Sequence, residues 1–240
     1  MRLDQFLAKT KGWSERTARQ EILRRVVRVD ESVTVEHRRE IDKFSRVELG
    51  TCLLQEGLRR VYLMTHKRIG VVSATRDPEH PTVLEKIELP ERDTLHLAGR
   101  LDRSSSGLLL LSNDGRWTSS ITDPESHLAK TYLVETDREI PFEAVARFQE
   151  GFHFLPEDIQ TKPAELQILD PCRALVILRE GRYHQIKRMF HRLDGIRLRS
   201  LHREQIGDLR LPDDLAPGQW RHLTPSEVSL FLPKPGEKQN

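Results

Sequence analysis

Charged and hydroxyl side chains interrupt two apolar runs between residues 95 and 115, where the sequence reads LHLAGRLDRSSSGLLLLSNDG. If residues 94–102 form a strand, successive side chains point to opposite faces. One face then carries Leu95, Leu97 and Leu101, and the other carries His96, Ala98, Arg100 and Asp102. The first face can pack on a core. The second presents a carboxylate that can attack carbon, stabilise positive charge or take a proton.

Asp102 is the residue of this segment whose position most needs an explanation. It lies at the end of the predicted strand, precedes a serine-rich turn at 104–107 and has apolar neighbours. A carboxylate there is costly unless it is paired or hydrogen-bonded. It either caps the turn or pairs with Arg100 or Arg103, or it is held ionised for chemistry. The three serines also suggest a serine hydrolase. The sequence has no Gly-x-Ser-x-Gly motif here, which argues against that function.

A second group of reactive side chains lies at residues 181–193, GRYHQIKRMFHRL, where we predict a helix over Arg182–Leu193. Its apolar stripe would consist of Ile186, Met189, Phe190 and Leu193, and another face would carry His184, Lys187, Arg188 and His191. Residues 180–203 hold seven Lys and Arg against two Asp and Glu, a local net charge of +5. This is either a solvated basic helix or a groove for a polyanion, with one cation turned inward to hold a buried carboxylate ionised.

The elements that must position these groups form a second region, which we assign to residues 61–232. Short β-rich runs alternate there with short helical runs and frequent turns. GLLLLSN at 107–113 predicts a buried strand, and 113–115 predict another turn. No βαβ rhythm of regular length is present, so we predict an α+β domain with a mainly antiparallel mixed sheet.

Two further helices are predicted in this region. One covers Phe142–Gly151, and the last begins at Thr224, with capping-box spacing and a proline at its first position. Residues 233–240, PKPGEKQN, are predicted to be disordered.

Residues 1–48 predict a separate small module. A helix over Arg2–Lys11 ends at Gly12, and Ser14 caps a second helix with Thr17–Leu23 as its body. The run VVRVDESVTV predicts a hairpin. Residues 49–60 have no clear period and two glycines, so we assign them to a linker.

The module is rich in arginine. It holds 12 Lys and Arg against 9 Asp and Glu. Five of the basic residues fall within the thirteen positions 16–28: Arg16, Arg19, Arg24, Arg25 and Arg28. This is either a solvated helix face or a surface that binds phosphates.

Composition limits the class of protein. The chain has 240 residues, 32% of them charged and 6% aromatic, with a net charge of +2, so an interaction with nucleic acid must rest on local clusters. Cys52 and Cys172 lie far apart, so we expect neither a zinc site nor a disulfide framework. No signal peptide or membrane span is evident. We expect a soluble cytoplasmic protein.

Two resemblances to known families follow from these motifs. The order of RLD, SERTAR and VRVD in residues 1–48 resembles the S4 RNA-binding domain, although Glu31 stands where that family usually has glycine. GRLDxxSSGLLLLSNDG, KTYLV and EGRYHQIKRMF resemble three signatures of the RsuA type of ribosomal RNA pseudouridine synthase. DPEHPTVL, LHREQIG and LAPGQWRHLT are more similar to its small-subunit (16S) members. Where many relatives have Asn-Lys-Pro-x-Gly, this chain has HKRIG at 66–70.

The resemblance implies an enzyme that isomerises uridine to pseudouridine in 16S rRNA without a cofactor or metal. It implies that Asp102 is the catalytic aspartate, that Tyr132 stacks on the base, and that Lys187 is the basic partner of the aspartate. Arg100 and Ile186 would belong to the substrate pocket. We expect RNA contacts from a set of basic residues: Arg2, Arg16, Arg19, Arg24, Arg25, Arg182, His184, Arg188 and Arg203.

Three alternatives remain at this stage. The first is that the enzyme acts on 23S instead of 16S rRNA. The second is that the chain is an S4-type RNA-binding protein without activity, and the third is that it is the serine hydrolase considered above. The motifs make one site per chain, so we expect a monomer. The choice of uridine, and whether naked RNA or a ribonucleoprotein is the substrate, are not encoded in these motifs.

Overall fold

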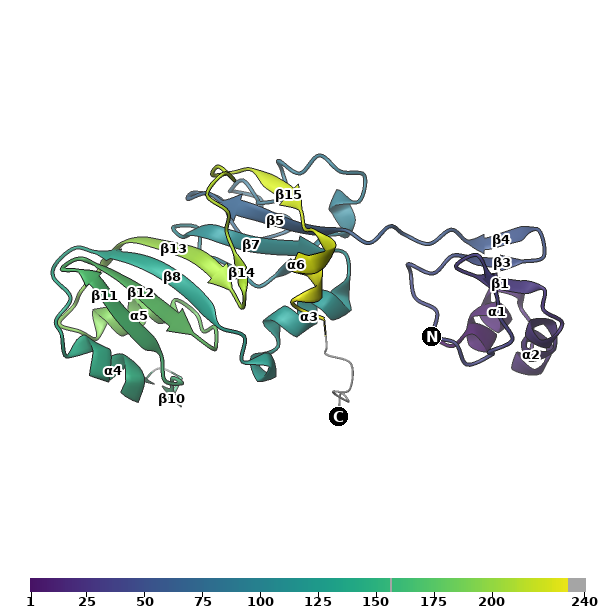
Figure 1. Ribbon diagram of the computed structural model, residues 1–240, viewed down its shortest axis with the longest axis horizontal. Coiled ribbons are helices and arrows are strands. Elements are labelled where there is room, and N and C mark those ends of the chain that lie inside the picture. Colours follow the sequence, from purple (N-terminus) through teal and green to yellow (C-terminus); the bar gives the residue numbers. More distant parts are fainter. Residues whose placement is uncertain (156, 233–240) are drawn as a thin grey trace. The chain divides into compact units, whose positions relative to one another are not determined.

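The computed structural model describes residues 1–155 and 157–232, and the predicted disordered tail lies outside them. The chain divides into two compact units, Met1–Arg60 and Val61–Asn240 (Figure 1). Each unit has its own core.

The first unit contains the two predicted helices and a four-stranded sheet. Its helices are α1 (Leu3–Lys11) and α2 (Glu15–Leu23). The sheet has the order β2-β1-β3-β4 and consists of β1 (Val27–Val29), β2 (Ser32–Val33), β3 (Val47–Leu49) and β4 (Cys52–Gln55). Gly12 ends α1 in a left-handed conformation, and the Ser14 side chain accepts a hydrogen bond from the Thr17 backbone, as the sequence predicts. The arrangement is compatible with an S4-like module.

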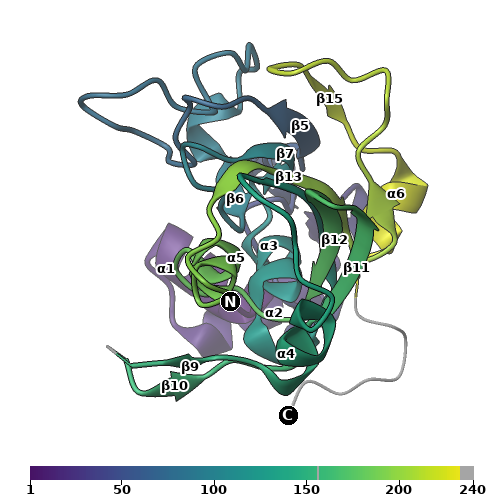
Figure 2. The ribbon, with the colours of Figure 1, turned by 90° about the vertical axis from the view of Figure 1, so that its left-hand side faces the viewer.

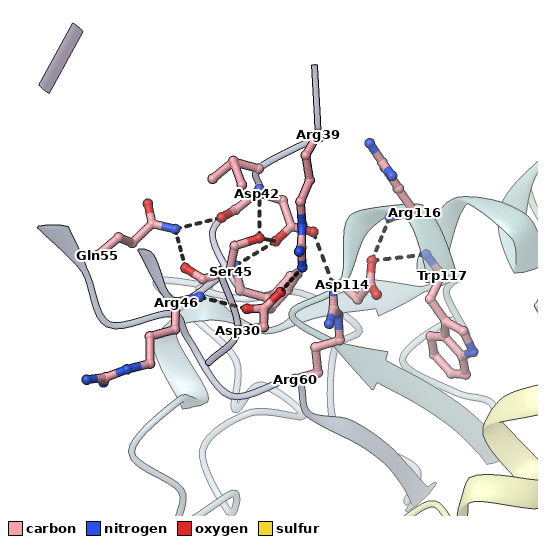
Figure 3. Close-up of polar contacts among 12 residues, drawn as sticks. Asp30, Arg39, Asp42, Ser45, Arg46, Gln55, Arg60, Asp114, Arg116 and Trp117 are labelled. Atoms are coloured by element: carbon pink, nitrogen blue, oxygen red, sulfur yellow. Dashed lines mark hydrogen bonds and ion pairs between the residues drawn. The ribbon is translucent and has the colours of Figure 1, made fainter. Parts of the chain in front are cut away.

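The hairpin of this unit forms although it lacks the expected glycine. Asp30 and Glu31 have φ values of 50° and 64°, as a tight hairpin turn between β1 and β2 requires. The Asp30 carboxylate accepts hydrogen bonds from the Arg39 guanidinium and the Arg46 backbone, both at 2.9 Å (Figure 3). These two bonds hold the strained turn in place.

The linker predicted over residues 49–60 is wrong for its first half. Strand β4 lies within it and pairs antiparallel with β3. The two glycines that suggested a linker include Gly50, which turns the chain between these strands with a φ of 58°. A short hairpin and a linker can both contain glycines and lack a clear periodicity, so the sequence pattern did not distinguish between these two structures.

The second unit is built on one large mixed sheet of nine strands, as the α+β prediction requires. Its order is β11-β12-β8-β13-β7-β5-β15, with β14 beside β13 and β6 beside β7. The parallel pair is β13 with β7, and the other neighbours run antiparallel. The strands are β5 (Tyr62–Lys67), β6 (His96–Ala98), β7 (Ser106–Ser112), β8 (Lys130–Thr136), β11 (Glu165–Asp170), β12 (Arg173–Leu178), β13 (Leu198–Ile206), β14 (Leu209–Arg210) and β15 (Trp220–His222).

Helices cover this sheet in two places. Helices α4 (Ala144–Glu150) and α5 (Gln185–His191) contribute to the core over β8 and β12, and α3 (Gly115–Thr122) contributes to the core over β5 and β7. Helix α6 (Pro225–Ser229) has the predicted capping box between Thr224 and Glu227. Two short 3-10 helices, η1 (Arg92–Thr94) and η2 (Pro124–Ser126), lie in the connections. Figure 2 shows β9 (His153–Phe154) and β10 (Ile159–Gln160) as a hairpin extending from this unit.

The strand predicted over residues 94–102 is shorter than expected. It consists of β6 alone, because Gly99 has a φ of 91° and ends the extended conformation. Ala98 is buried with the leucines of β7, and Leu101 joins a different cluster from Leu95. Arg100 and Asp102 are therefore not on one strand face. They lie in the loop that joins β6 to β7.

The turn predicted at 113–115 is instead the start of a helix. The Asp114 carboxylate caps α3 by accepting hydrogen bonds from the backbones of Arg116 and Trp117 (Figure 3). Trp117 and Ile121, four residues apart, are buried. The sequence Asn-Asp-Gly fits a hairpin turn and a helix start equally well, so the local string did not decide between them.

Two other helices begin later than predicted. Helix α4 begins at Ala144 instead of Phe142, whose side chain is exposed. Helix α5 begins at Gln185 instead of Arg182, because His184 has a φ of 49° and cannot belong to the helix. The apolar residues predicted for this helix are all buried, although the last of them, Leu193, lies beyond the end of α5.

Gly107 explains why β7 and β13 approach closely, and it yields a stability prediction. Its φ is 110°, and a Cβ at this position would clash with the Arg203 backbone oxygen. We expect Gly107→Ala to lower the free energy of unfolding by more than about 2 kcal/mol, measured by urea denaturation. Gly115→Ala is the matched control, because its Cβ meets nothing within 4 Å. Equal denaturation midpoints for the two variants would contradict this account of the strand pair.

Candidate active site

A cavity of about 630 Å³ lies in the second unit, beside the loop between β6 and β7. Further walls come from β8, from β13, from the chain that leads into α5, from residues 72–74 and from residues 121–124. Its volume is in the range of sites that bind small molecules or single nucleotides. The two segments that the sequence singled out, 95–115 and 181–193, therefore meet at one cavity.

Asp102 and Lys187 form an ion pair at this cavity. Lys187 Nζ lies 2.6 Å from Asp102 Oδ2 and also donates a hydrogen bond to Ser104 Oγ at 2.9 Å. The His184 ring lies 3.4 Å from the same carboxylate oxygen. Both side chains of the pair are about 30% exposed (30% and 29%), so a ligand can reach them. Asp102 Oδ1 has no hydrogen-bond partner among the described residues, which leaves this oxygen for a ligand.

A buried lysine holds the backbone on either side of the turn at Asp102. Lys67, at the end of β5, donates hydrogen bonds to the backbone oxygens of Arg68, Asp102 and Ser105 at 3.2, 3.0 and 2.7 Å. Its side chain is 1% exposed. Burial lowers the pKa of Lys67 to about 8, although the charge of Asp102 acts in the opposite direction.

Ser73 fixes the same loop from a second side. Its hydroxyl donates to the Leu101 backbone oxygen at 2.7 Å and accepts from the Leu101 backbone nitrogen at 3.1 Å. The position of Asp102 therefore depends on side chains from β5 and from the connection that follows it.

Tyr132 and Arg203 form the wall contributed by β8 and β13, where they are directly paired in register. Tyr132 is 8% exposed. Arg203 Nε donates to the Leu108 backbone oxygen at 2.8 Å, and Nη1 donates to the Arg100 backbone oxygen at 3.4 Å. The Arg203 guanidinium carbon lies 6.0 Å from the centre of the Tyr132 ring.

Comparison with known proteins decides the family. Residues 61–192 match the family model described as RNA pseudouridylate synthase. The chain belongs to this family. It is therefore a pseudouridine synthase, which is an isomerase.

Relatives and a solved structure agree with this assignment over nearly the whole chain. The chain is 48% identical to "Ribosomal small subunit pseudouridine synthase A" of Pseudomonas aeruginosa, over 95% of this chain and 99% of the relative. It is 40% identical to the protein of the same name from Escherichia coli strain K12, over 97% and 100%. A crystal structure of a pseudouridylate synthase matches with a TM-score of 0.70 and 34% identity, over 97% of this chain and 100% of that chain.

The remaining residues predicted for the site of this synthase differ in their surroundings. Arg100 is exposed and lines the cavity, and Ile186 is buried in the core where it meets the cavity. Arg182 also lines the cavity and pairs with Glu180 at 3.0 Å.

Arg188 does not line the cavity. It pairs with Glu157 at 2.6 Å, and its guanidinium lies 3.7 Å from the centre of the Phe154 ring. This contact ties α5 to the hairpin of β9 and β10.

Arg203, which we predict to contact the RNA backbone near the site, lies in the cavity wall and is buried, so it is not part of an exposed basic surface. Its side chain is 2% exposed, and it faces the Tyr132 side of the sheet. The basic cluster at 180–203 mixes residues from a loop, a helix and a strand, so the charge count alone did not distinguish a buried arginine from a solvated one.

Some arginines of the first unit are engaged within it. The side chain of Asp4 is fully buried and binds Arg2 and Arg19, both at 2.8 Å, and His37 at 3.2 Å. The Arg2 guanidinium, helped by Arg19 and His37, holds the pKa of Asp4 well below its usual range. Arg24 pairs with Glu21 at 2.8 Å.

Arg16 and Arg25 differ from these three arginines. Neither forms an ion pair within residues 1–155 and 157–232. They are therefore the members of the predicted RNA-contact set in this unit whose charge no carboxylate offsets.

Sequence reasoning did not single out Lys67, Ser73 or Lys130 as residues of the site. Lys67 belongs to the HKRIG stretch and Lys130 to the KTYLV stretch, so their motifs were the available signal. In the described part of the chain, no helix is long and apolar enough to span a membrane. No three His, Cys, Asp or Glu side chains there form a group suited to a metal ion.

The lowered pKa of Lys67 predicts how stability changes with pH. The pKa of Lys67 is about 8 in the folded protein, against the ordinary value of 10.5. Between these two pH values the unfolded chain therefore holds more protons at this residue than the folded protein does. Lys67 therefore makes the folded state more stable as pH rises through this window. From near pH 7 to about pH 9.5, we expect the free energy of unfolding of the protein to rise by roughly 1–2 kcal/mol relative to Lys67→Met.

Urea denaturation of the two proteins at both pH values measures this difference. Lys86→Met, which removes an exposed lysine, should run parallel to the unsubstituted protein. A difference that stays constant or falls as pH rises would show that Lys67 is not a buried ammonium.

Proposed function

We propose that this chain isomerises one uridine of 16S ribosomal RNA to pseudouridine, as the names of its relatives suggest. The observation that carries the proposal is the carboxylate of Asp102, which binds Lys187 through Oδ2 and leaves Oδ1 for a ligand at the cavity. The finer proposal is that the target is uridine 516. The small-subunit relatives cover almost the whole chain, which favours 16S over 23S rRNA.

The proposed reaction breaks the N1–C1′ bond of uridine, turns the uracil while it stays bound, and joins C5 to C1′. The C5 proton leaves and N1 gains a proton, so nothing is oxidised or added. Asp102 can serve this reaction by attacking carbon, by stabilising positive charge at C1′ or by taking a proton from the sugar. Lys187 forms an ion pair with the carboxylate and fixes its direction.

The uridine must leave its stack to reach Asp102. Extrusion costs a few kcal/mol and is least costly in loops and single strands. We propose that Tyr132 stacks on the extruded base, since its ring lies in the cavity wall. Such stacking stabilises by on the order of 1–3 kcal/mol per base. Arg100 and Ile186 would complete the pocket around the nucleotide.

RNA binding is proposed to use the first unit as an S4-like module, together with basic groups near the cavity. Arg16 and Arg25 are the best candidates for phosphate contacts in the first unit, because no carboxylate offsets their charge. Arg182 and His184 line the cavity and are candidates near the target nucleotide. Binding through phosphates weakens as salt increases. Because the chain carries one complete site, we propose that it acts as a monomer. We propose the cytoplasm as its location.

Replacement of one carboxylate oxygen tests this function directly. We expect Asp102→Asn to reduce pseudouridine formation at least about 1,000-fold, because the amide can neither attack carbon nor take a proton. RNA affinity should change by less than about threefold, because the amide has nearly the same shape. The measurement is position-resolved mapping of pseudouridine in 16S and 23S rRNA incubated with each protein, alongside a filter-binding assay.

Asp208→Asn is the matched control, because it makes the same substitution at an exposed aspartate outside the cavity. It should retain full activity. Product formation by Asp102→Asn at the normal rate would contradict the proposed role of Asp102. Modification of 23S rRNA alone would contradict the proposed target.

A further inference from the structure

Lys130 and Arg203 are two cations on the cavity wall that no carboxylate neutralises. The Lys130 ammonium donates a hydrogen bond to the Leu128 backbone oxygen at 3.0 Å. Arg203 binds backbone oxygens only, and its Nη2 is buried without a partner. Within residues 1–155 and 157–232, neither side chain forms an ion pair. Arg203 is buried and Lys130 is half-buried. Cations withdrawn from water without an anion are costly, so this arrangement points to a negative charge that arrives with the ligand.

The register of the sheet places both cations beside Tyr132. Lys130 and Tyr132 are two residues apart on β8, so their side chains lie on the same face. Arg203 is the direct partner of Tyr132 on β13. Burial lowers the pKa of Lys130, and the nearby positive charge of Arg203 adds to this effect. The two cations therefore flank the ring that is proposed to stack on the uracil.

The acidic side chains of the cavity are already engaged elsewhere. Asp102 binds Lys187, and Glu180 binds Arg182 and Gln185. Asp123 accepts a hydrogen bond from the backbone of Glu125. None of these three carboxylates pairs with Lys130 or Arg203 among the described residues.

We propose that Lys130 and Arg203 stabilise the negative charge that the uracil carries while it is detached from the sugar. This inference rests on the proposed isomerisation. When the N1–C1′ bond breaks, its electron pair stays on N1 and spreads to O2 and O4 of the ring. When C5 joins C1′, the ring returns this electron pair, C5 loses a proton and N1 gains one. Preorganised positive charge beside the ring lowers the barrier to cleavage of the N1–C1′ bond. It also holds the detached uracil in the cavity until C5 bonds to C1′.

The test compares two leaving groups. Fluorine withdraws electrons, so the anion of 5-fluorouracil is more stable than that of uracil and depends less on protein cations. RNA with uridine or 5-fluorouridine at the target position is incubated with excess protein. Loss of the original nucleoside reports cleavage of the N1–C1′ bond in a single turnover.

We expect Lys130→Met to slow cleavage of uridine about 10- to 100-fold, and to slow cleavage of 5-fluorouridine clearly less. Lys130→Arg, which keeps the charge, should recover most of the rate. Arg203→Lys keeps the charge but not both backbone hydrogen bonds, so it should recover part of the rate that Arg203→Met loses. Lys86→Met is the control for removal of a lysine outside the cavity.

An equal loss on both substrates, or uridine cleavage by Lys130→Met within twofold of the normal rate, would overturn this inference. These outcomes are distinct from failure of the proposed function. If Asp102→Asn is inactive while Lys130→Met is fully active, only the role of the cations is wrong. If the unsubstituted protein forms no pseudouridine in 16S rRNA, the proposed function itself is wrong.

Discussion

The ion pair between Asp102 and Lys187 is the interaction on which the site depends. It joins the loop between β6 and β7 to helix α5, which lie 85 residues apart in the chain. Among the described residues, Lys187 is the cation that binds the Asp102 carboxylate most closely, at 2.6 Å. With Lys187 in place, one oxygen is fixed and the other is left for a ligand. The sheet and α5 act together as the frame that keeps the two charges in contact.

Positive charge around this single carboxylate exceeds what is needed to balance it. Lys67 lies beneath the loop, Lys187 lies beside it, and Lys130 and Arg203 line the facing wall. Lys67 and Arg203 bind backbone oxygens, so they also fix the shape of the loop. An excess of cations is unfavourable in an isolated protein, but it suits a ligand that carries phosphates and becomes a ring anion during reaction. The arrangement therefore connects the stability of the loop to the proposed chemistry.

The sequence predicted features that depend on local residues better than those that depend on sheet register. Gly12, Ser14 and Thr224 mark helix ends correctly, because caps are decided within a few residues. The meeting of segments 95–115 and 181–193 was anticipated from their charges and motifs. The end of β6 at Gly99 and the burial of Arg203 were missed, because both depend on which strands pair. Lys67 was also missed, because it binds backbone oxygens, whose positions depend on the fold and not on the neighbouring residue types.

The ion pair itself can be tested by changing only its cation. Lys187→Met removes the charge and Lys187→Arg keeps it, and both can be compared in single-turnover reactions with RNA that carries the target uridine. The account predicts that Lys187→Met reacts at least about 100-fold more slowly at nearly unchanged RNA affinity, and that Lys187→Arg recovers a substantial part of the rate. A normal single-turnover rate for Lys187→Met would contradict the claim that this cation holds the reactive carboxylate.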